Sequence, residues 1–512
     1  MATATCLWLP RSAWSRERWS SNPFALGVAS GSPTHDSVVL WSRLLLPMQD
    51  RLSHSALTVH WELAHDEGFK SIVQRGQTSA LPELAHSVHV ELHALAPDRW
   101  YFYRFRAGEA FSAVGRTRTL AAPGARVASL RLAYASCQRW EHGYYSAYRH
   151  MRSENLDAVL FLGDYIYESP GTARPVRQAA GNWALSLDDY RDRYALYKSD
   201  PDLQAMHAHC PWLLTWDDHE VQNDYAGWQA GNTGPGVVSF AQRRASAYQA
   251  FYEHMPIRSS SLTRSLAGLT SGAELRLYSR VRHGQLASLY LLDSRQYRDP
   301  QVCTRDGALG ASLVKPEQCP LWHDPSRSLL GAQQEQWLEA EMGQAAAEQG
   351  VWNVLGQQTI FGKRDNLSGP GQIHWNDGWD GYSSARRRLT DAMQKQLLPN
   401  PVLLGGDIHE NWVGHVKADY EQESSANLGV EFCGTSISSR ASSGKKLPQR
   451  LAENRHFVYA QAQSRGYGVV EFTPMQLTTR LRVVDDVTKR DGAISTLAQF
   501  TVQAGRPQLE LA

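Results

Sequence analysis

Five short apolar runs in this chain each end in side chains that can bind cations or transfer protons. Runs of this length and composition are typical of buried β-strands. In an open α/β sheet, functional side chains gather beyond the carboxyl ends of the strands. Five such ends would bring together a cysteine, several aspartates, two histidines and two glutamines, which indicates a site for hard cations and hence a hydrolase. The runs cover residues 130–137, 158–164, 212–219, 352–358 and 401–409.

From residue 130 onward, these runs alternate with stretches that have helical periodicity. The alternation predicts an α/β or α+β domain. After His409 the pattern returns to strand-like segments, which predict a second sheet packed on the first. The helical stretches cover 143–156, 240–255, 331–349 and 387–398, and the later strands cover 428–438, 466–474 and 478–486.

The first part of the chain has a different pattern. Residues 24–120 form short alternating segments separated by Gly, Pro, Asp and Ser, which predicts a small antiparallel β-sandwich of the fibronectin or immunoglobulin type. The segment AAPGARVAS at 121–129 has the composition of a linker. We therefore expect a β-sandwich domain over 23–120 and a catalytic domain over 130–505.

Composition narrows the class of protein. The chain has 512 residues, 42% hydrophobic content, 20% charged content and a formal net charge of +1. These values describe an ordinary globular protein and give no support for a nucleic-acid or membrane-surface role. No apolar stretch is long enough to span a bilayer, and the first 23 residues lack the apolar core of a complete secretory signal. We favour a disordered leader there; a remnant of an export segment and a misassigned start remain alternatives.

Two of the six cysteines flank a polar loop. Cys303 and Cys319 enclose a Gly-containing segment, which favours a disulfide and an oxidising compartment over two unrelated thiols. Cys210 and Cys433 lie in apolar settings and are expected to be buried structural thiols.

Two aspartates follow glycines at strand ends. Gly163 precedes Asp164, and a carboxylate in that position can bridge two cations, whereas an isolated Gly-Asp pair would signal only a turn. Asp407 and His409 are two residues apart, and in an extended segment both would face the same side and serve one metal or two adjacent metals. The alternative is a capping aspartate followed by a surface histidine.

The segment 216–220 concentrates three carboxylates around His219, and Asn223 and Asp224 follow closely. Carboxylates packed this tightly raise one another's pKa, and a cation relieves the repulsion. The alternative is a solvated acidic loop. Cys137 ends another strand; its thiolate would suit iron or zinc, while a cysteine nucleophile and an inert buried thiol are the other interpretations.

These segments together resemble one known family. The chain resembles the PhoD family of alkaline phosphatases and phosphodiesterases in YASCQ, LGDYIYE, TWDDHEVQNDYAG, DSRQYRDP, LLGAQQEQWL and LLGGDIHENW, and its opening PFALGVASGSPTHDSVVLWSRL resembles the start of that family's N-terminal β-sandwich. The resemblance covers about residues 23–505. It implies an α/β fold, namely the four-layer α/β/β/α sandwich of the metallophosphatase superfamily, after an N-terminal β-sandwich.

The resemblance also implies cofactors and residue roles. PhoD-like enzymes are associated with Fe³⁺ beside Ca²⁺. Asp164 would bridge to calcium, with Asn223 and either Asp218 or Asp407 completing that site. His219 would act as the catalytic histidine together with Asp164. The iron ligands would be Cys137, Asp164, Tyr167, Asp407 and His409.

We therefore predict a metal-dependent phosphoesterase that hydrolyses phosphate esters with a metal-activated hydroxide. Two other classes remain open: a different esterase on the same frame, acting on carboxylic esters or lipid head groups, and a non-catalytic binding protein. We expect a monomer with no specific nucleic-acid partner and no membrane span. The resemblance and the predicted disulfide imply a periplasmic or extracellular location, and a cytoplasmic one stays open.

Overall fold

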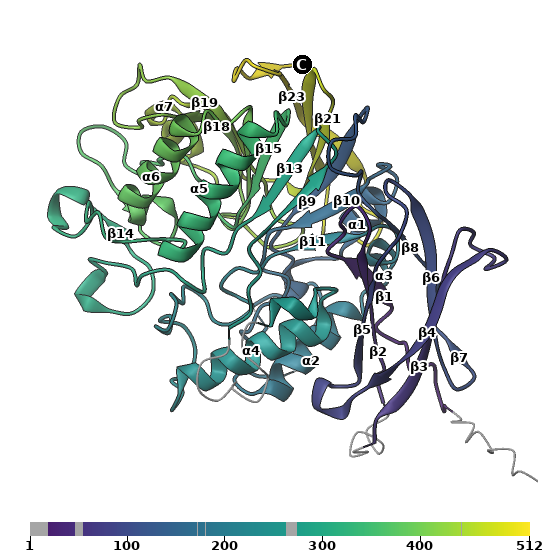
Figure 1. Ribbon diagram of the computed structural model, residues 1–512. Helices are drawn as coiled ribbons and strands as arrows, with labels where there is room; N and C mark the ends of the chain where they lie inside the picture. The colour runs from purple at the N-terminus through teal and green to yellow at the C-terminus, as the bar shows by residue number, and fades with distance from the viewer. Residues whose placement is uncertain (1–18, 47–54, 172, 180, 263–273, 442) are drawn as a thin grey trace, which may run out of the picture.

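The computed structural model describes residues 19–46, 55–171, 173–179, 181–262, 274–441 and 443–512. Most of the expected N-terminal leader, with Cys6, lies outside these residues. Two large sheets occupy the centre of the molecule, and a smaller sheet lies beside them (Figure 1).

The first sheet has ten strands, in the spatial order β24 (Glu510–Leu511), β23 (Ile494–Gln503), β22 (Gln476–Val484), β21 (Arg465–Phe472), β9 (Leu130–Ala135), β10 (Ala158–Phe161), β11 (Trp212–Leu214), β1 (Val28–Gly31), β2 (Val38–Arg43) and β5 (Ser87–Leu92). The second has seven, in the order β12 (Ser279–His283), β13 (Ala287–Leu291), β15 (Trp352–Gly356), β17 (Pro401–Gly405), β19 (Asn427–Cys433), β18 (Asn411–Lys417) and β20 (Phe457–Gln461). The third contains β4 (Ile72–Ala80), β3 (Leu57–Ala64), β6 (Trp100–Ala107), β7 (Ala110–Phe111) and β8 (Gly115–Arg118). A short pair joins β14 (Leu313–Val314) to β16 (His374–Trp375).

All five apolar runs contain strands, but one open sheet does not hold them all. β9, β10 and β11 are parallel neighbours in the first sheet, whereas β15 and β17 are parallel neighbours in the second. We expected the strands after His409 to form the second sheet. Instead, that sheet also contains β12, β13, β15 and β17, and the later strands β21 and β22 extend the first sheet beside β9.

Each central strand is apolar on both faces because its alternate side chains enter two different hydrophobic cores. In β10, Ala158 and Leu160 enter the core between the two sheets, while Val159 and Phe161 enter a second core beneath helices. In β17, Leu404 enters the core between the sheets and Leu403 the core under α5 and α6. The two sheets therefore pack face to face, with helices on the outer face of each.

The helices are α1 (Ser146–Met151), α2 (Leu187–Lys198), α3 (Pro201–His207), α4 (Phe240–His254), α5 (Ala332–Ala347), α6 (Ser383–Lys395) and α7 (Leu447–Glu453). Short 3-10 turns are η1 (Pro82–Leu84), η2 (Trp140–His142), η3 (Ser259–Ser261), η5 (Arg305–Gly307), η6 (Pro316–Gln318) and η7 (Trp379–Tyr382). The first four α-helices pack on the first sheet, and α5 and α6 pack on the second. Sequence analysis did not identify α2, although Ser186 and Asp189 form a capping box at its start.

The N-terminal strands build a core of their own. Val38 and Leu40 of β2 and Val90 of β5 pack against Val59 of β3 and Tyr103 of β6. Strand β1 lies between β11 and β2 and joins this part to the rest of the first sheet; its pairing with β11 is a single register pair, Gly31 with Trp212. A Cβ at Gly31 would lie 2.8 Å from the Trp212 carbonyl oxygen and 2.5 Å from that of Pro256, so the join requires glycine.

The disulfide prediction is confirmed, because Cys303 and Cys319 are bonded. Cys210 and Cys433 are buried free thiols, also as expected. Within the described ranges, no helix has the length and apolarity needed to cross a bilayer.

Candidate metal centre

The predicted ligands meet where strands of both sheets end. Cys137 follows β9, Asp164 follows β10, and Asp407 and His409 follow β17. All four adopt left-handed backbone conformations, with φ of 59°, 57°, 65° and 57°. Non-glycine residues rarely adopt such φ values, and those that do cluster at functional sites. One expectation fails here: the 407–409 segment is not extended, so strand alternation does not place Asp407 and His409 on one side.

A glycine brings the first sheet's loops together. Gly163 has φ of 108°, and a Cβ there would lie 2.5 Å from both the backbone nitrogen and the Cβ of Asp217. No other residue fits this position. Asp164 therefore projects directly beside the loop that follows β11.

The first group of possible ligand atoms belongs to Cys137, Asp164 and His409, which lie within 4.8 Å of one another. The Tyr167 hydroxyl joins it: it donates to Asp164 Oδ2 at 2.8 Å, lies 3.2 Å from His409 Nε2, and accepts from Ser439. His409 Nδ1 contacts the carbonyl oxygen of Arg440 at 2.8 Å. A carbonyl only accepts, so the proton resides on Nδ1 and the Nε2 lone pair is free for a cation.

The second group contains Asp164, Asp218 and His219, and the third contains Asp218, Asp224 and Asp377, each again within 4.8 Å. Asp164 thus belongs to two groups, as does Asp218, so the three groups form a row. In the described part of the chain, Asp164 Oδ1 is buried and accepts no hydrogen bond. An orphaned anionic oxygen inside the protein is unfavourable unless a cation compensates it.

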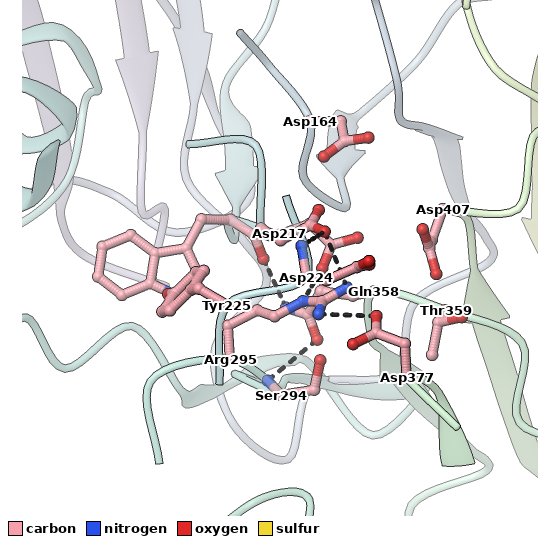
Figure 2. Close-up of polar contacts among 12 residues, drawn as sticks. Asp164, Asp217, Asp224, Tyr225, Ser294, Arg295, Gln358, Thr359, Asp377 and Asp407 are labelled. Atoms are coloured by element: carbon pink, nitrogen blue, oxygen red, sulfur yellow. Dashed lines mark hydrogen bonds and ion pairs between the residues drawn. The ribbon is translucent and has the colours of Figure 1, made fainter. Parts of the chain in front are cut away.

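Arg295 anchors the acidic side of this row (Figure 2). This buried arginine donates to Asp217 Oδ1 at 2.5 Å, its NH1 atom lies 2.7 Å from Asp377 Oδ2, and its NH2 atom lies 3.6 Å from Asp218 Oδ2. Arg298 pairs with Asp377 Oδ1 at 2.8 Å. The two arginines fix the aspartates in place and offset part of their negative charge.

The three carboxylates of the loop around His219 make different contacts. Asp217 pairs with Arg295. Glu220 accepts the backbone N–H groups of Asp164, Tyr165 and Asp217, so it organises the loop rather than facing a cation. Only Asp218 of the three enters the ligand groups. The solvated-loop alternative does not hold, because all three carboxylates are buried.

His219 is held by a buried carboxylate. Its Nδ1 atom lies 2.7 Å from Glu168 Oε2, and its ring packs on that of Tyr167 with centroids 4.1 Å apart. Burial lowers the pKa of His219, but the carboxylates of Glu168 and Asp164 outweigh this and hold the pKa well above its usual value. His219 is thus placed to carry a proton on Nε2.

Burial shifts the pKa values of the other titratable groups along this row. Burial, reinforced by neighbouring carboxylates, raises the pKa of Cys137, Tyr167 and Asp164 well above their ordinary values. Burial also raises the pKa of Asp407, to about 6, and lowers that of His409 to about 4, so His409 stays neutral. A bound cation would reverse these shifts for the anionic donors, because it favours their deprotonated forms.

Two predicted ligands are less clearly placed. The Asp407 carboxylate lies outside the three groups among the described residues, and Arg295, Asp218 and Asp377 are the charged groups that act on its pKa. Asn223 donates its backbone N–H to Glu168 Oε1 at 2.9 Å. The assignment of calcium to Asp218 or Asn223 therefore remains a prediction.

Sequence reasoning missed Arg295, Asp377 and Ser439. Arg295 had an available signal, because it follows β13, a sixth buried strand, in the same way that the aspartates follow theirs. Asp377 follows the two-residue strand β16 in an irregular segment and has no comparable signal.

Comparison with known proteins identifies the class to which this fold and site belong. The family model for PhoD-like phosphatase matches residues 132–481, and the model for the PhoD-like phosphatase N-terminal domain matches residues 11–121. The chain therefore belongs to the PhoD-like phosphatase family, which confirms the resemblance seen in the sequence.

Two relatives cover nearly the whole chain. Alkaline phosphatase D of Bacillus subtilis (strain 168) is 44% identical over 498 residues, spanning 95% of this chain and 82% of that protein. A solved structure titled "Structure of PhoD" superposes with a TM-score of 0.88 at 42% identity and covers 97% of this chain and 93% of that chain. The mixed α/β fold is thus shared with PhoD over 97% of this chain.

Proposed function

We propose that this enzyme hydrolyses phosphate esters at the metal centre built around Asp164. The observation that carries the proposal is the double membership of Asp164, which lies in two ligand groups and keeps one buried oxygen without a hydrogen bond. The Bacillus subtilis relative is named alkaline phosphatase D, and its similarity over 95% of this chain supports the same reaction class.

The layer order supports the finer description of the fold. Helices α1–α4, the ten-stranded sheet, the seven-stranded sheet and helices α5 and α6 follow one another through three apolar cores. This order favours the four-layer metallophosphatase sandwich, and the separate core of β2, β3, β5 and β6 favours an N-terminal β-sandwich. We keep 23–120 and 130–505 as domain bounds, although β24 continues the first sheet beyond residue 505.

The donor chemistry supports Fe³⁺ in the first group and Ca²⁺ beside it. Thiolate, phenolate and imidazole donors from Cys137, Tyr167 and His409 suit a transition metal. The second and third groups offer carboxylate oxygens, with Asp218 shared between them, and oxygen donors suit calcium. Bound cations of this kind would lower the pKa of a water and neutralise charge on the transferring phosphoryl group.

The chain's own residues would orient and protonate the substrate. Glu168 holds the His219 ring so that Nε2 faces the ligand groups, where it can donate a proton to the leaving oxygen. Tyr167 packs on that ring and fixes its tilt. Arg295 and Arg298 keep Asp218 and Asp377 at their positions while substrate charge enters the site.

A hydrolysis assay with elemental analysis tests the proposal. Purified protein should contain iron and calcium and should release phosphate from p-nitrophenyl phosphate, with bis-p-nitrophenyl phosphate measured alongside for diester activity. Turnover of p-nitrophenyl acetate with no phosphate release from either phosphate ester would replace the proposal with a carboxylic esterase. Inactivity on all three esters in iron- and calcium-loaded protein would favour a binding protein.

The disulfide supports export as part of the proposal. Cys303 and Cys319 are bonded in a loop next to the metal centre, and such bonds persist in oxidising compartments. We propose a periplasmic or extracellular location on this ground.

A further inference from the structure

One side of the metal centre carries an excess of positive charge that the ligand groups do not use. The loop 436–440 wraps the first ligand group: Ser439 donates to the Tyr167 hydroxyl, and the Arg440 carbonyl accepts from His409 Nδ1. The backbone N–H of Arg440 donates to His142 Nδ1 at 3.0 Å, and its guanidinium donates to the carbonyl of Arg174 at 2.8 Å. We call Arg174, Arg440 and the adjoining imidazole of His142 the cationic rim; the two arginines supply its charge, and His142 supplies a neutral ring.

The rim is accessible and poorly neutralised. Arg174 and Arg440 are exposed, His142 is half-buried, and within the described ranges neither arginine forms an ion pair with a carboxylate. Because His142 Nδ1 accepts a hydrogen bond, its ring proton resides on Nε2, which leaves one more N–H donor at this edge.

Nearby carboxylates do not neutralise the positive charge of the cationic rim. Glu141, the carboxylate next to His142, is fully buried and is shared by Arg139 at 3.4 Å and Arg193 at 3.8 Å. Buried Arg465 adds a further cation behind the loop; it donates to the carbonyls of His409 and Ser439. The acidic third group, which includes Asp377, lies at the opposite end of the row of ligand groups.

A substrate held at the ligand groups would therefore have the exposed arginine donors of the rim at one end of the row and the acidic third group at the other. We propose that the cationic rim is an anion-recognition subsite that selects phosphate esters whose organic part carries a second negative group, a carboxylate or another phosphate. This inference rests on the proposed function, because the rim acts on an ester already placed at the ligand groups. Exposed arginines are suited to the task because each offers a forked set of donors that matches a carboxylate or phosphate.

Two esters with closely related leaving groups test the subsite. Phenyl phosphate carries only the scissile phosphate, while 4-carboxyphenyl phosphate adds one carboxylate. The wild-type enzyme should prefer the carboxylated ester in kcat/KM, and rising salt should erode that preference. Arg440→Gln keeps the backbone carbonyl that holds His409, so it should retain metal and leave phenyl phosphate within about twofold. The same variant should lose about tenfold in kcat/KM on the carboxylated ester, mainly through KM.

Matched variants separate the possible outcomes. Arg75→Gln changes an exposed arginine of β4 in the third sheet and should alter neither substrate. Equal losses on both esters in Arg440→Gln, or no loss on either, would overturn the subsite. Should Arg440→Gln lose metal or fold poorly, Arg174→Gln decides: a loss confined to the carboxylated ester supports the rim, and an unchanged ratio rejects it. A wild-type enzyme that hydrolyses neither ester would reject the proposed function instead.

Discussion

Glu168 Oε2 lies 2.7 Å from His219 Nδ1, and this contact fixes which ring nitrogen faces the substrate. Glu168 is fully buried, and its second oxygen accepts the backbone N–H of Asn223 at 2.9 Å. Burial raises the pKa of Glu168, but the charge of His219, the hydrogen bond to its ring and the Asn223 N–H together lower the pKa below its ordinary value. The pair therefore presents Nε2, with a proton, to the ligand groups.

The leaving-group dependence of two variants tests this pairing. His219→Ala should keep its metals and slow alkyl phosphates by about 10²–10⁴-fold, with a much smaller effect on p-nitrophenyl phosphate, whose leaving group departs without a proton. Glu168→Gln should show the same selectivity at about tenfold, because it acts only through the imidazole. Equal losses on both substrates would assign His219 to phosphate binding, and loss of metal would make it a ligand.

Asp164→Asn should reduce kcat by more than about 10³-fold. The amide halves the anionic donor capacity at the one residue shared by the first two ligand groups. Elemental analysis should show lower metal content in the same sample. Near-normal turnover with full metal content would rule out the bridging role, and Asp157→Asn, a carboxylate that pairs with Arg118 away from the site, is the control.

The colour of the purified enzyme tests whether the first ligand group binds ferric iron. Phenolate and thiolate bound to ferric iron give visible charge-transfer absorption, so the purified enzyme should be coloured. Tyr167→Phe should shift or remove the band, since it takes away the phenolate but keeps the aromatic packing on His219. A colourless, fully active enzyme that contains only zinc would defeat the iron assignment.

The sequence predicted which side chains meet at this site better than it predicted how they are arranged. Cys137, Asp164, Asp218, His219 and His409 were identified because each follows a buried strand, and strand ends collect functional groups. The features that the sequence did not predict depend on tertiary contacts. Asp217 and Asp218 are adjacent in sequence, but Asp217 pairs with the distant Arg295 at 2.5 Å, whereas Asp218 belongs to two of the ligand groups.

Local sequence patterns were also insufficient to predict how the strands are divided between the sheets. The apolar character of β10 and β17 predicted burial, but a strand that is apolar on both faces carries no mark of which sheet will receive it. The disulfide was predictable because its two cysteines bracket one polar loop, a local signal. Asp377 lies in an irregular segment whose position depends on Arg298 and Gln301, so no local pattern could find it.

Removing the disulfide should weaken cation binding as well as stability. The clipped loop donates Ser312 N–H to Asn376 Oδ1 at 2.7 Å, next to Asp377, and Ala311 N–H to Asp224 at 3.4 Å. A double Cys303→Ala/Cys319→Ala variant should lose about 3 kcal/mol of unfolding free energy and need more calcium for half-maximal activity. Cys210→Ala, which removes a buried thiol from the core under the helices, should lower stability alone. An unchanged calcium requirement in the double variant would contradict the coupling.

Lys198 makes stability depend on pH in the alkaline range. It is 1% exposed, and its ammonium lies 4.1 Å from the Trp41 ring and 5.4 Å from that of Tyr165. Burial lowers its pKa from 10.5 to about 7. Between these two values the unfolded chain holds a proton that the folded chain lacks, so Lys198 makes stability rise with pH across this window and is most destabilising below it.

Lys198→Met should remove this dependence. At pH 7 the free energy of unfolding should increase by about 2 kcal/mol, the burial penalty less the cation–π attraction to the two rings. Thermal melts of both proteins from pH 7 to 10 measure the difference, which should narrow as pH rises. Melting temperatures that change with pH in parallel in the two proteins would show that Lys198 stays charged in the folded enzyme.

The first ligand group draws on two sheets, and this division bears on when in the enzyme's maturation a cation could bind. Cys137 and Asp164 come from the first sheet, His409 comes from the second, and β9 is completed only when β21 pairs with it. A nascent chain that has not yet emerged past His409 lacks one member of the first ligand group, and a chain that has not emerged past Phe472 lacks the neighbour of β9. Loading of a cation at this group would therefore follow the docking of the two sheets, so an enzyme that held one would have both of its halves folded and packed together.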